Sequence, residues 1–126
     1  MPLRVGIVTA AHLHVWSYIH GFRKHPETEL VGVWDHDEAR GKEFAAKTEL
    51  PFVDDLDALL NQVDAVAIVS ENKRHAELTA KAAAKGKHVL CEKPLVTNED
   101  EAKIMMEAVE RSGIKLMTAF PCRYSP

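Results

Sequence analysis

The sequence lacks the features that mark disulfide-rich, membrane-spanning and nucleic-acid-binding proteins. Two cysteines in 126 residues are too few for a disulfide framework, which fits a protein of the reducing cytoplasm. No apolar run approaches the ~20 residues that a membrane span needs, and the first residues lead into a strand-like run rather than a signal peptide. The formal net charge is −3, with no stripe of lysine and arginine. These absences argue against membrane and nucleic-acid partners.

Short apolar runs and runs with helical spacing alternate along the whole chain. Strands are predicted at residues 4–8, 30–34, 65–69, 87–90 and 116–119, and helices around residues 15–22, 39–45, 56–60, 73–84 and 102–109. The strand runs are continuously apolar, which is typical of strands buried on both faces of a parallel sheet. The pattern predicts a doubly wound α/β fold of the Rossmann type, with a mostly parallel sheet and helices on both faces.

Polar residues and glycines mark the ends of the predicted helices. Asp37, Asn72 and Asn98 are expected as N-caps, and Gly86 and Gly113 as C-terminal stops. The side chains expected to face inward are Ala39, Phe44 and Ala45 in the second helix, and Ala102, Met105, Met106 and Val109 in the last one.

The most informative stretch is the tetrad Cys91-Glu92-Lys93-Pro94, which follows an apolar strand. Ligands of open α/β sheets bind beyond the carboxyl ends of the strands. A lysine there can stabilise negative charge on a reacting oxygen, or relay a proton if its pKa is lowered. Pro94 fixes the turn that aims the lysine, and a cis Lys93–Pro94 peptide stays open. Cys91 lacks a base partner in the sequence, so we expect a small buried residue rather than a nucleophile.

Together with its neighbours, the tetrad resembles the N-terminal half of the glucose–fructose oxidoreductase / inositol dehydrogenase (Gfo/Idh/MocA) family. Residues 86–95 are the closest match, and the matching residues span nearly all of the chain. The resemblance implies an NAD(P)-dependent oxidoreductase, a dehydrogenase that transfers hydride to or from a sugar, polyol or related hydroxy compound. It also implies a dinucleotide-binding domain at residues 1–119 and, at residues 120–126, the start of a connection to a second, substrate-binding domain.

The resemblance assigns roles to individual residues. It makes Lys93 the catalytic residue between nicotinamide and substrate, and Glu92 a group that binds the cofactor or orients the lysine; the alternative for Glu92 is a surface carboxylate. It places Ser70, Asn72 and His75 along the cofactor, although Asn72 is first a helix cap and His75 can equally be a partly buried helix residue. The family takes its other acid/base group from the second domain, so we expect little or no turnover from this chain alone. A full-length form is expected to be a homo-oligomer.

The predicted phosphate loop departs from its usual pattern. Dinucleotide folds place G-x-G-x-x-G after the first strand, where backbone amides approach the pyrophosphate at a helix N-terminus. Aligned on the strand, the three glycine positions here are Thr9, Ala11 and His14. Two outcomes stay open, a looser site in which Thr9, Ala11, His12 and Leu13 face the cofactor, or a loop that no longer binds it. We favour binding because the other cofactor positions match.

His12 and His14 also raise the possibility of a metal. Residues two apart do not share a helix face, and no carboxylate or cysteine nearby completes a site. We therefore predict no metal and interpret both histidines as loop residues near the mouth of the pocket.

Asp35 closes the second strand. An acidic residue there accepts hydrogen bonds from the adenosine ribose and repels a 2′-phosphate, which favours NAD over NADP. The alternative is that Asp35 only caps the following turn, and the nearby Arg40 weakens the electrostatic argument.

Three functions stay open. The chain is the cofactor half of a dehydrogenase, a non-catalytic nucleotide-binding or interaction module that reuses the fold, or an enzyme of the same superfamily that uses another nucleotide. Lys93 and Glu92 favour the first, and the glycine-free loop favours the second.

Overall fold

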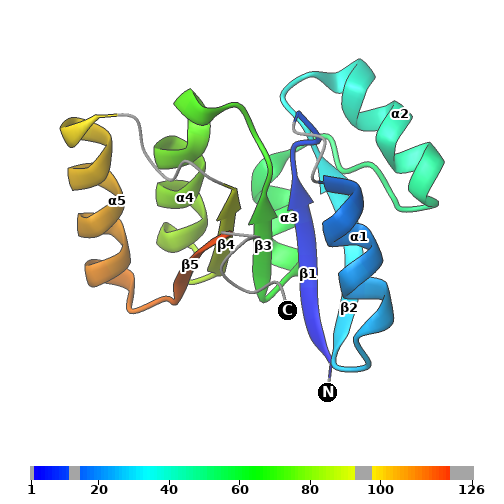
Figure 1. Ribbon diagram of the computed structural model, residues 1–126, viewed down its shortest axis with the longest axis horizontal. Helices are drawn as coiled ribbons and strands as arrows, with labels where there is room; N and C mark the ends of the chain where they lie inside the picture. Colours follow the sequence, from blue (N-terminus) through cyan, green and yellow to red (C-terminus); the bar gives the residue numbers. More distant parts are fainter. Residues whose placement is uncertain (1, 12–14, 93–97, 120–126) are drawn as a thin grey trace.

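The structure is a computed structural model that describes residues 2–11, 15–92 and 98–119, with the side chains of Asn72 and Ala119 left aside. The predictions for His12, Leu13, His14, Lys93, Pro94 and residues 120–126 lie outside the described residues. Along the described chain the elements are β1 (Leu3–Val8), α1 (Val15–Lys24), β2 (Thr28–Trp34), α2 (Glu38–Thr48), α3 (Leu56–Gln62), β3 (Ala65–Ile68), the 3₁₀ turn η1 (Asn72–Arg74), α4 (His75–Ala84), β4 (His88–Glu92), α5 (Glu99–Ser112) and β5 (Leu116–Ala119) (Figure 1).

The strands form one parallel sheet in the order β2-β1-β3-β4-β5. The chain passes outward from β1 to β2 and then crosses to β3 on the other side of β1. This reversal places a topological switch point between β1 and β3, and ligands of doubly wound sheets bind outside the carboxyl ends of the strands at such a point. The predicted fold class is therefore confirmed.

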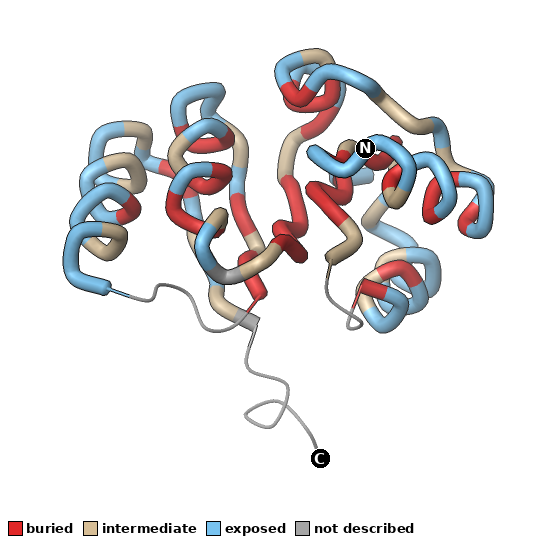
Figure 2. The backbone as a smooth tube through the Cα atoms, turned by 90° about the horizontal axis from the view of Figure 1, so that it is seen from above, coloured by how far each residue is buried: buried red, intermediate tan, exposed pale blue. Residues whose placement is uncertain are grey.

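Two clusters of buried apolar side chains cover the two faces of the sheet. Neighbouring strand residues point to opposite faces, so Ile7 and Ala67 join the cluster beneath α1 and α2, whereas Val8 and Ile68 join the one beneath α3, α4 and α5. Figure 2 shows the buried residues concentrated on the strands and on the helix sides that face them. Burial on both faces explains the continuously apolar strand runs of β1 and β3.

Most of the predicted helix ends are confirmed. The Asp37 side chain accepts a hydrogen bond from the Arg40 amide at 3.1 Å, and the Asn98 side chain accepts one from the Glu101 amide at 2.9 Å. Gly113 ends α5 with a φ of 72°, in the left-handed region that glycine adopts without a steric cost.

The helix after Asn72 begins later than predicted, and the capping role expected of the Asn72 side chain lies outside the described side chains. Residues 72–74 form the turn η1, and α4 begins one turn later, with Arg74 at its N-cap position and no side-chain cap. The backbone tightens into a 3₁₀ turn before the α-helix, as is common at helix N-termini. The sequence does not distinguish such a turn from the first turn of the helix.

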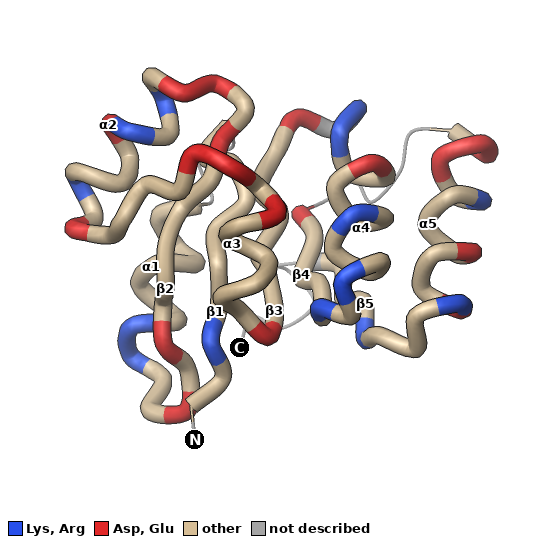
Figure 3. Tube along the Cα trace, turned by 180° about the vertical axis from the view of Figure 1, so that it is seen from behind, with Lys and Arg blue, Asp and Glu red and all other residues tan. Residues whose placement is uncertain are grey.

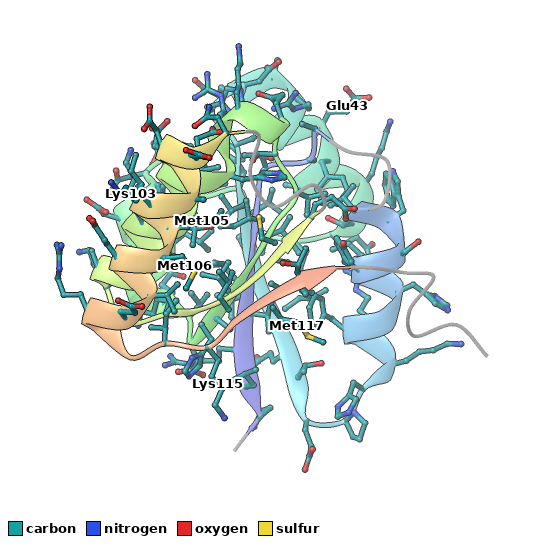
Figure 4. The ribbon with its side chains drawn as sticks, turned by 60° about the vertical axis from the view of Figure 1, so that its left-hand side comes forward. Glu43, Lys103, Met105, Met106, Lys115 and Met117 are labelled. Carbon is teal, nitrogen blue, oxygen red and sulfur yellow. The ribbon has the colours of Figure 1, made fainter. Side chains whose placement is uncertain are left out.

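Two side chains expected in the core are exposed. In α2 the buried stripe is Gly41, Phe44, Ala45 and Thr48, which leaves Ala39 on the solvent side. In α5, Met105 is 1% exposed and Met106 is 53% exposed (Figure 4). α5 lies at the edge of the molecule and buries only a narrow stripe of side chains. Met106, one residue after Met105, therefore faces outward.

Charges of both signs are interspersed over the helices (Figure 3). Within the described ranges, no helix is long and apolar enough to cross a membrane.

Candidate functional site

The parallel strands bring several of the predicted site residues to one edge of the sheet. Thr9 follows β1, Asp35 follows β2, Ser70 follows β3, and Glu92 ends β4. Because all of these strands run in the same direction, their carboxyl ends meet at that edge. The residues come from four strands, so the sheet rather than any local motif builds the site.

Thr9 stands at the first glycine position of the loop and has the backbone conformation of a glycine. Its φ is 67°, in the left-handed region, where a β-branched residue is a genuine outlier. Its amide donates to the Trp34 carbonyl at 2.6 Å, and its buried hydroxyl has no hydrogen-bond partner among the described residues. The tight turn therefore survives the loss of its glycine, with a strain on the order of 1–3 kcal/mol.

The loop after β1 is tied to the end of β2 through Asp35. The Ala10 amide donates to Asp35 Oδ2 at 3.0 Å, and the Asp37 amide donates to Asp35 Oδ1 at 3.0 Å. Arg40 donates to both carboxylate oxygens, from Nε and Nη2, at 2.7 Å each. Burial alone would raise the pKa of Asp35, but the Arg40 hydrogen bonds and the two amides outweigh it and hold that pKa below its ordinary value.

The Asp35 side chain is 0% exposed. The structure therefore shows the turn-capping role that was the alternative for this residue. A ribose role would require hydroxyl groups to take the place of the Arg40 guanidinium.

A cluster of charged side chains extends from Asp35 to the loop after β3. Glu71 Oε1 lies 3.1 Å from Arg40 Nη2, and Glu71 Oε2 lies 3.2 Å from Arg74 Nε. His36 lies between the two carboxylates, with Nε2 3.1 Å from Glu71 Oε2 and Nδ1 3.5 Å from Asp35 Oδ1. We call these residues the Glu71 cluster, and they join the loops beyond β2 and β3 on either side of β1.

Sequence reasoning missed the Glu71 cluster. Arg40 and Glu71 are 31 positions apart, and neither has a local signal that would pair them. Only the strand order, which places β2 and β3 on either side of β1, brings the two loops close.

Ser70 and His75 are both buried beneath the edge. His75 Nε2 lies 3.1 Å from the Ser70 carbonyl oxygen, and the Ser70 hydroxyl donates to the Glu71 carbonyl at 3.1 Å. These contacts hold the turn between β3 and η1 in shape. Roles for Ser70, Asn72 and His75 toward a cofactor stay predictions.

Glu92 is 1% exposed, so the alternative of a surface carboxylate is wrong. Tyr18 of α1 donates its hydroxyl to Glu92 Oε2, a contact between residues 74 positions apart that sequence reasoning also missed. Burial, with the hydrogen bond and the charge of Glu92, raises the pKa of Tyr18. The helix α1, on one face of the sheet, therefore fixes the Glu92 carboxylate at the end of β4.

Cys91 is buried, as predicted. Burial raises the pKa of its thiol to about 12. A thiol with that pKa stays protonated at neutral pH and is a poor nucleophile.

The edge of the sheet meets the topological requirements of a dinucleotide site. It has the switch point, a glycine-type turn after β1, a hydroxyl at that turn with no partner in the described part of the chain, and a carboxylate after β2. In the described ranges, no three His, Cys, Asp or Glu side chains come together as a metal would require.

Known proteins share this architecture. Residues 3–120 match the family GFO_IDH_MocA, described as an oxidoreductase family with an NAD-binding Rossmann fold. D-xylose 1-dehydrogenase (NADP(+)) 2 of Haloferax volcanii is 36% identical over 124 residues, which cover 96% of this chain and 38% of that protein. The scyllo-inositol 2-dehydrogenase (NADP(+)) IolU of Bacillus subtilis is 37% identical over 101 residues, 78% of this chain and 31% of that protein.

A solved structure shows the same relationship. KijD10, a 3-ketoreductase from Actinomadura kijaniata in complex with TDP-benzene and NADP, superposes with a TM-score of 0.86 at 31% identity. The match covers 100% of this chain and 40% of that one, so the chain spans about two fifths of the structure it matches. With the family match over residues 3–120, these likenesses show that the chain belongs to the Gfo/Idh/MocA oxidoreductase family, through its NAD-binding Rossmann domain.

Proposed function

We propose that this chain is the cofactor-binding part of a dehydrogenase that transfers hydride between NAD and a sugar, a polyol or a related hydroxy compound. The observation that carries the proposal is the left-handed φ of Thr9 at the switch point, because that backbone conformation serves a phosphate loop. The names of the relatives, which include D-xylose and scyllo-inositol, support the substrate class.

Each part of the edge has a role in this proposal. The pyrophosphate is bound by residues that follow β1, namely Thr9, Ala11, His12 and Leu13, and Asp35 accepts hydrogen bonds from the adenosine ribose hydroxyls. Ser70, Asn72 and His75 shape the wall along the cofactor. The bound nicotinamide supplies the hydride chemistry.

The residues beyond β4 complete the chemistry. Lys93 donates a hydrogen bond to the reacting substrate oxygen, or accepts a proton from it. Glu92, which accepts a hydrogen bond from Tyr18, fixes the end of β4 directly before Lys93 in the chain.

The preference for NAD is part of the proposal. A buried carboxylate after β2 disfavours a 2′-phosphate, and Glu71 places a second negative charge beside it. The two dehydrogenases above are named for NADP, so this chain would differ from them in its preferred cofactor. Adenosine ribose would displace the Arg40 guanidinium from Asp35.

The remaining parts of the proposal concern a longer protein in the cytoplasm. Residues 120–126 would lead from the domain of residues 1–119 into a substrate-binding domain, and the full-length form would be a homo-oligomer. The second domain would add the missing acid/base group, so this chain alone would bind cofactor and turn over little or nothing.

Calorimetric titration tests the proposal. We expect saturable binding of NAD⁺, competition by AMP, and a loss of affinity in Asp35→Ala, with circular dichroism to verify that the variant is folded. Added D-xylose or inositol should give no steady NADH production. Absence of NAD⁺ and AMP binding by the folded chain would favour the non-catalytic interaction module instead.

A further inference from the structure

The carboxylate of Glu71 contacts every basic side chain of the Glu71 cluster. Its two oxygens contact Arg40 at 3.1 Å, Arg74 at 3.2 Å and His36 at 3.1 Å. The side chains of Arg40, Arg74 and Glu71 are about one third exposed, so a ligand at the sheet edge can reach them.

Arg40 contacts two carboxylates, Asp35 and Glu71, and a bound ribose would need only Asp35. Its Nε and Nη2 bind Asp35, while Nη2 also lies near Glu71. When ribose hydroxyls bind Asp35, the guanidinium must leave that carboxylate. Glu71 is already within 3.1 Å and can keep the guanidinium after it leaves.

A 2′-phosphate would require the opposite arrangement. A phosphate monoester carries close to two negative charges at neutral pH and binds best to an arginine that is not shared with a carboxylate. Here Arg40 and Arg74 are both paired with Glu71, and the Glu71 carboxylate itself would repel the phosphate.

We propose that Glu71 is a specificity-determining residue, which holds Arg40 while adenosine ribose occupies Asp35 and keeps Arg40, Arg74 and His36 away from a 2′-phosphate. The proposal rests on the proposed cofactor role of the sheet edge. It adds a residue, contributed by the loop after β3, that selects between NAD and NADP.

The test compares nucleotide affinities in the wild type and in Glu71→Gln. The glutamine keeps the size of the side chain and removes its charge. The dissociation constants for NAD⁺ and NADP⁺, and for 5′-AMP and 2′,5′-ADP, are measured by calorimetry at fixed ionic strength. We expect the wild type to prefer NAD⁺, and the Kd ratio of NADP⁺ to NAD⁺ to fall by about fivefold in Glu71→Gln, the effect of one partly screened ion-pair interaction.

Glu43→Gln is the matched control. Glu43 lies on α2, pairs with Lys47 at 2.8 Å and is exposed, so this variant has the same net charge as Glu71→Gln without touching the cluster (Figure 4). Its Kd ratio should equal that of the wild type. If Glu71→Gln does not fold, Glu71→Asp, which draws the carboxylate back by one methylene, should lower the ratio in the same direction.

The outcomes separate this inference from the proposed function. An unchanged ratio in a Glu71 variant that still binds NAD⁺, or an equal change in Glu43→Gln, overturns the role of Glu71 alone. Failure of the wild type to bind any of the four nucleotides overturns the cofactor role as well.

Discussion

At the scale of single residues, Thr9 holds the least favourable backbone in the site. A β-branched side chain at a φ of 67° is crowded against its own backbone, and its buried hydroxyl has no hydrogen-bond partner among the described residues. Glycine has no such steric penalty, although its unfolded state is more flexible. Thr9 thus combines two costs at the position where dinucleotide folds place glycine.

Thr9→Gly should therefore stabilise the chain by about 1 kcal/mol, because relief of the strain and of the unpaired hydroxyl exceeds the entropic cost of glycine. Urea denaturation followed by circular dichroism measures the change. The neighbouring Ala10→Gly is the control and should destabilise by about 0.5–1 kcal/mol, since Ala10 has no positive φ to relieve. A loss of stability in Thr9→Gly would show that the turn carries no strain.

Tyr18 gives a prediction on pH dependence. Its pKa is raised in the folded chain by burial, by the hydrogen bond to Glu92 and by the charge of Glu92. The neutral phenol is therefore favoured on folding. Its contribution to stability is complete below about pH 10, the pKa of an ordinary tyrosine, and is lost as the pH rises through the higher folded value.

Comparing wild type with Tyr18→Phe isolates this effect. The phenylalanine lacks the donor to Glu92 and should lower the free energy of unfolding at pH 8 by about 1–3 kcal/mol. The difference between the two proteins should shrink between pH 10 and 11, as Tyr18 ionises in the unfolded wild type. A difference that stays constant over that range would contradict the raised pKa.

At the scale of elements, the sequence predicted the helices and strands better than it predicted the contacts between them. The caps at Asp37 and Asn98 are local, so their patterns were sufficient to predict them. The turn η1 before α4 was missed because a 3₁₀ turn and a first α-turn have the same residue pattern. Ala39 and Met106 were misplaced because the width of a buried stripe depends on what packs against the helix.

Gly41 shows how closely α2 approaches its neighbours. A Cβ added there would lie 2.5 Å from the Phe52 ring and 2.7 Å from the Asp35 Cβ, whereas one added at Gly21 of α1 would meet nothing within 4 Å. The two glycines occupy interior helix positions, where alanine is intrinsically better by about 1 kcal/mol. They differ in packing alone.

Gly41→Ala should therefore destabilise the chain by about 1–3 kcal/mol, because the added methyl group pushes α2 away from Phe52 and Asp35. Gly21→Ala should stabilise it by about 0.5–1 kcal/mol. Thermal and urea denaturation of the pair measure both signs. Equal effects at the two positions would contradict the close approach of α2 to the end of β2.

At the scale of the whole molecule, the site depends on strand order. Sequence reasoning placed Thr9, Asp35, Ser70 and Glu92 at this edge of the sheet, since each follows or ends a recognisable strand. It missed Glu71 and Tyr18, because their partners Arg40 and Glu92 lie 31 and 74 positions away in the chain. Such pairs depend on the strand order, whereas the alternation of strands and helices predicted only the doubly wound class of fold.

The central claim is that a dinucleotide binds across the carboxyl edge of the sheet, over the switch point between β1 and β3. The most direct test is to titrate the ¹⁵N-labelled chain with NAD⁺ and follow the backbone amide signals. The account predicts shifts at Thr9 and Ala10, at Asp35 and His36, and at Ser70 and Glu71, with the opposite edge of the sheet unchanged. Shifts confined to that opposite edge, around Gly86 and Gly113, or no shifts at saturating NAD⁺, would contradict it.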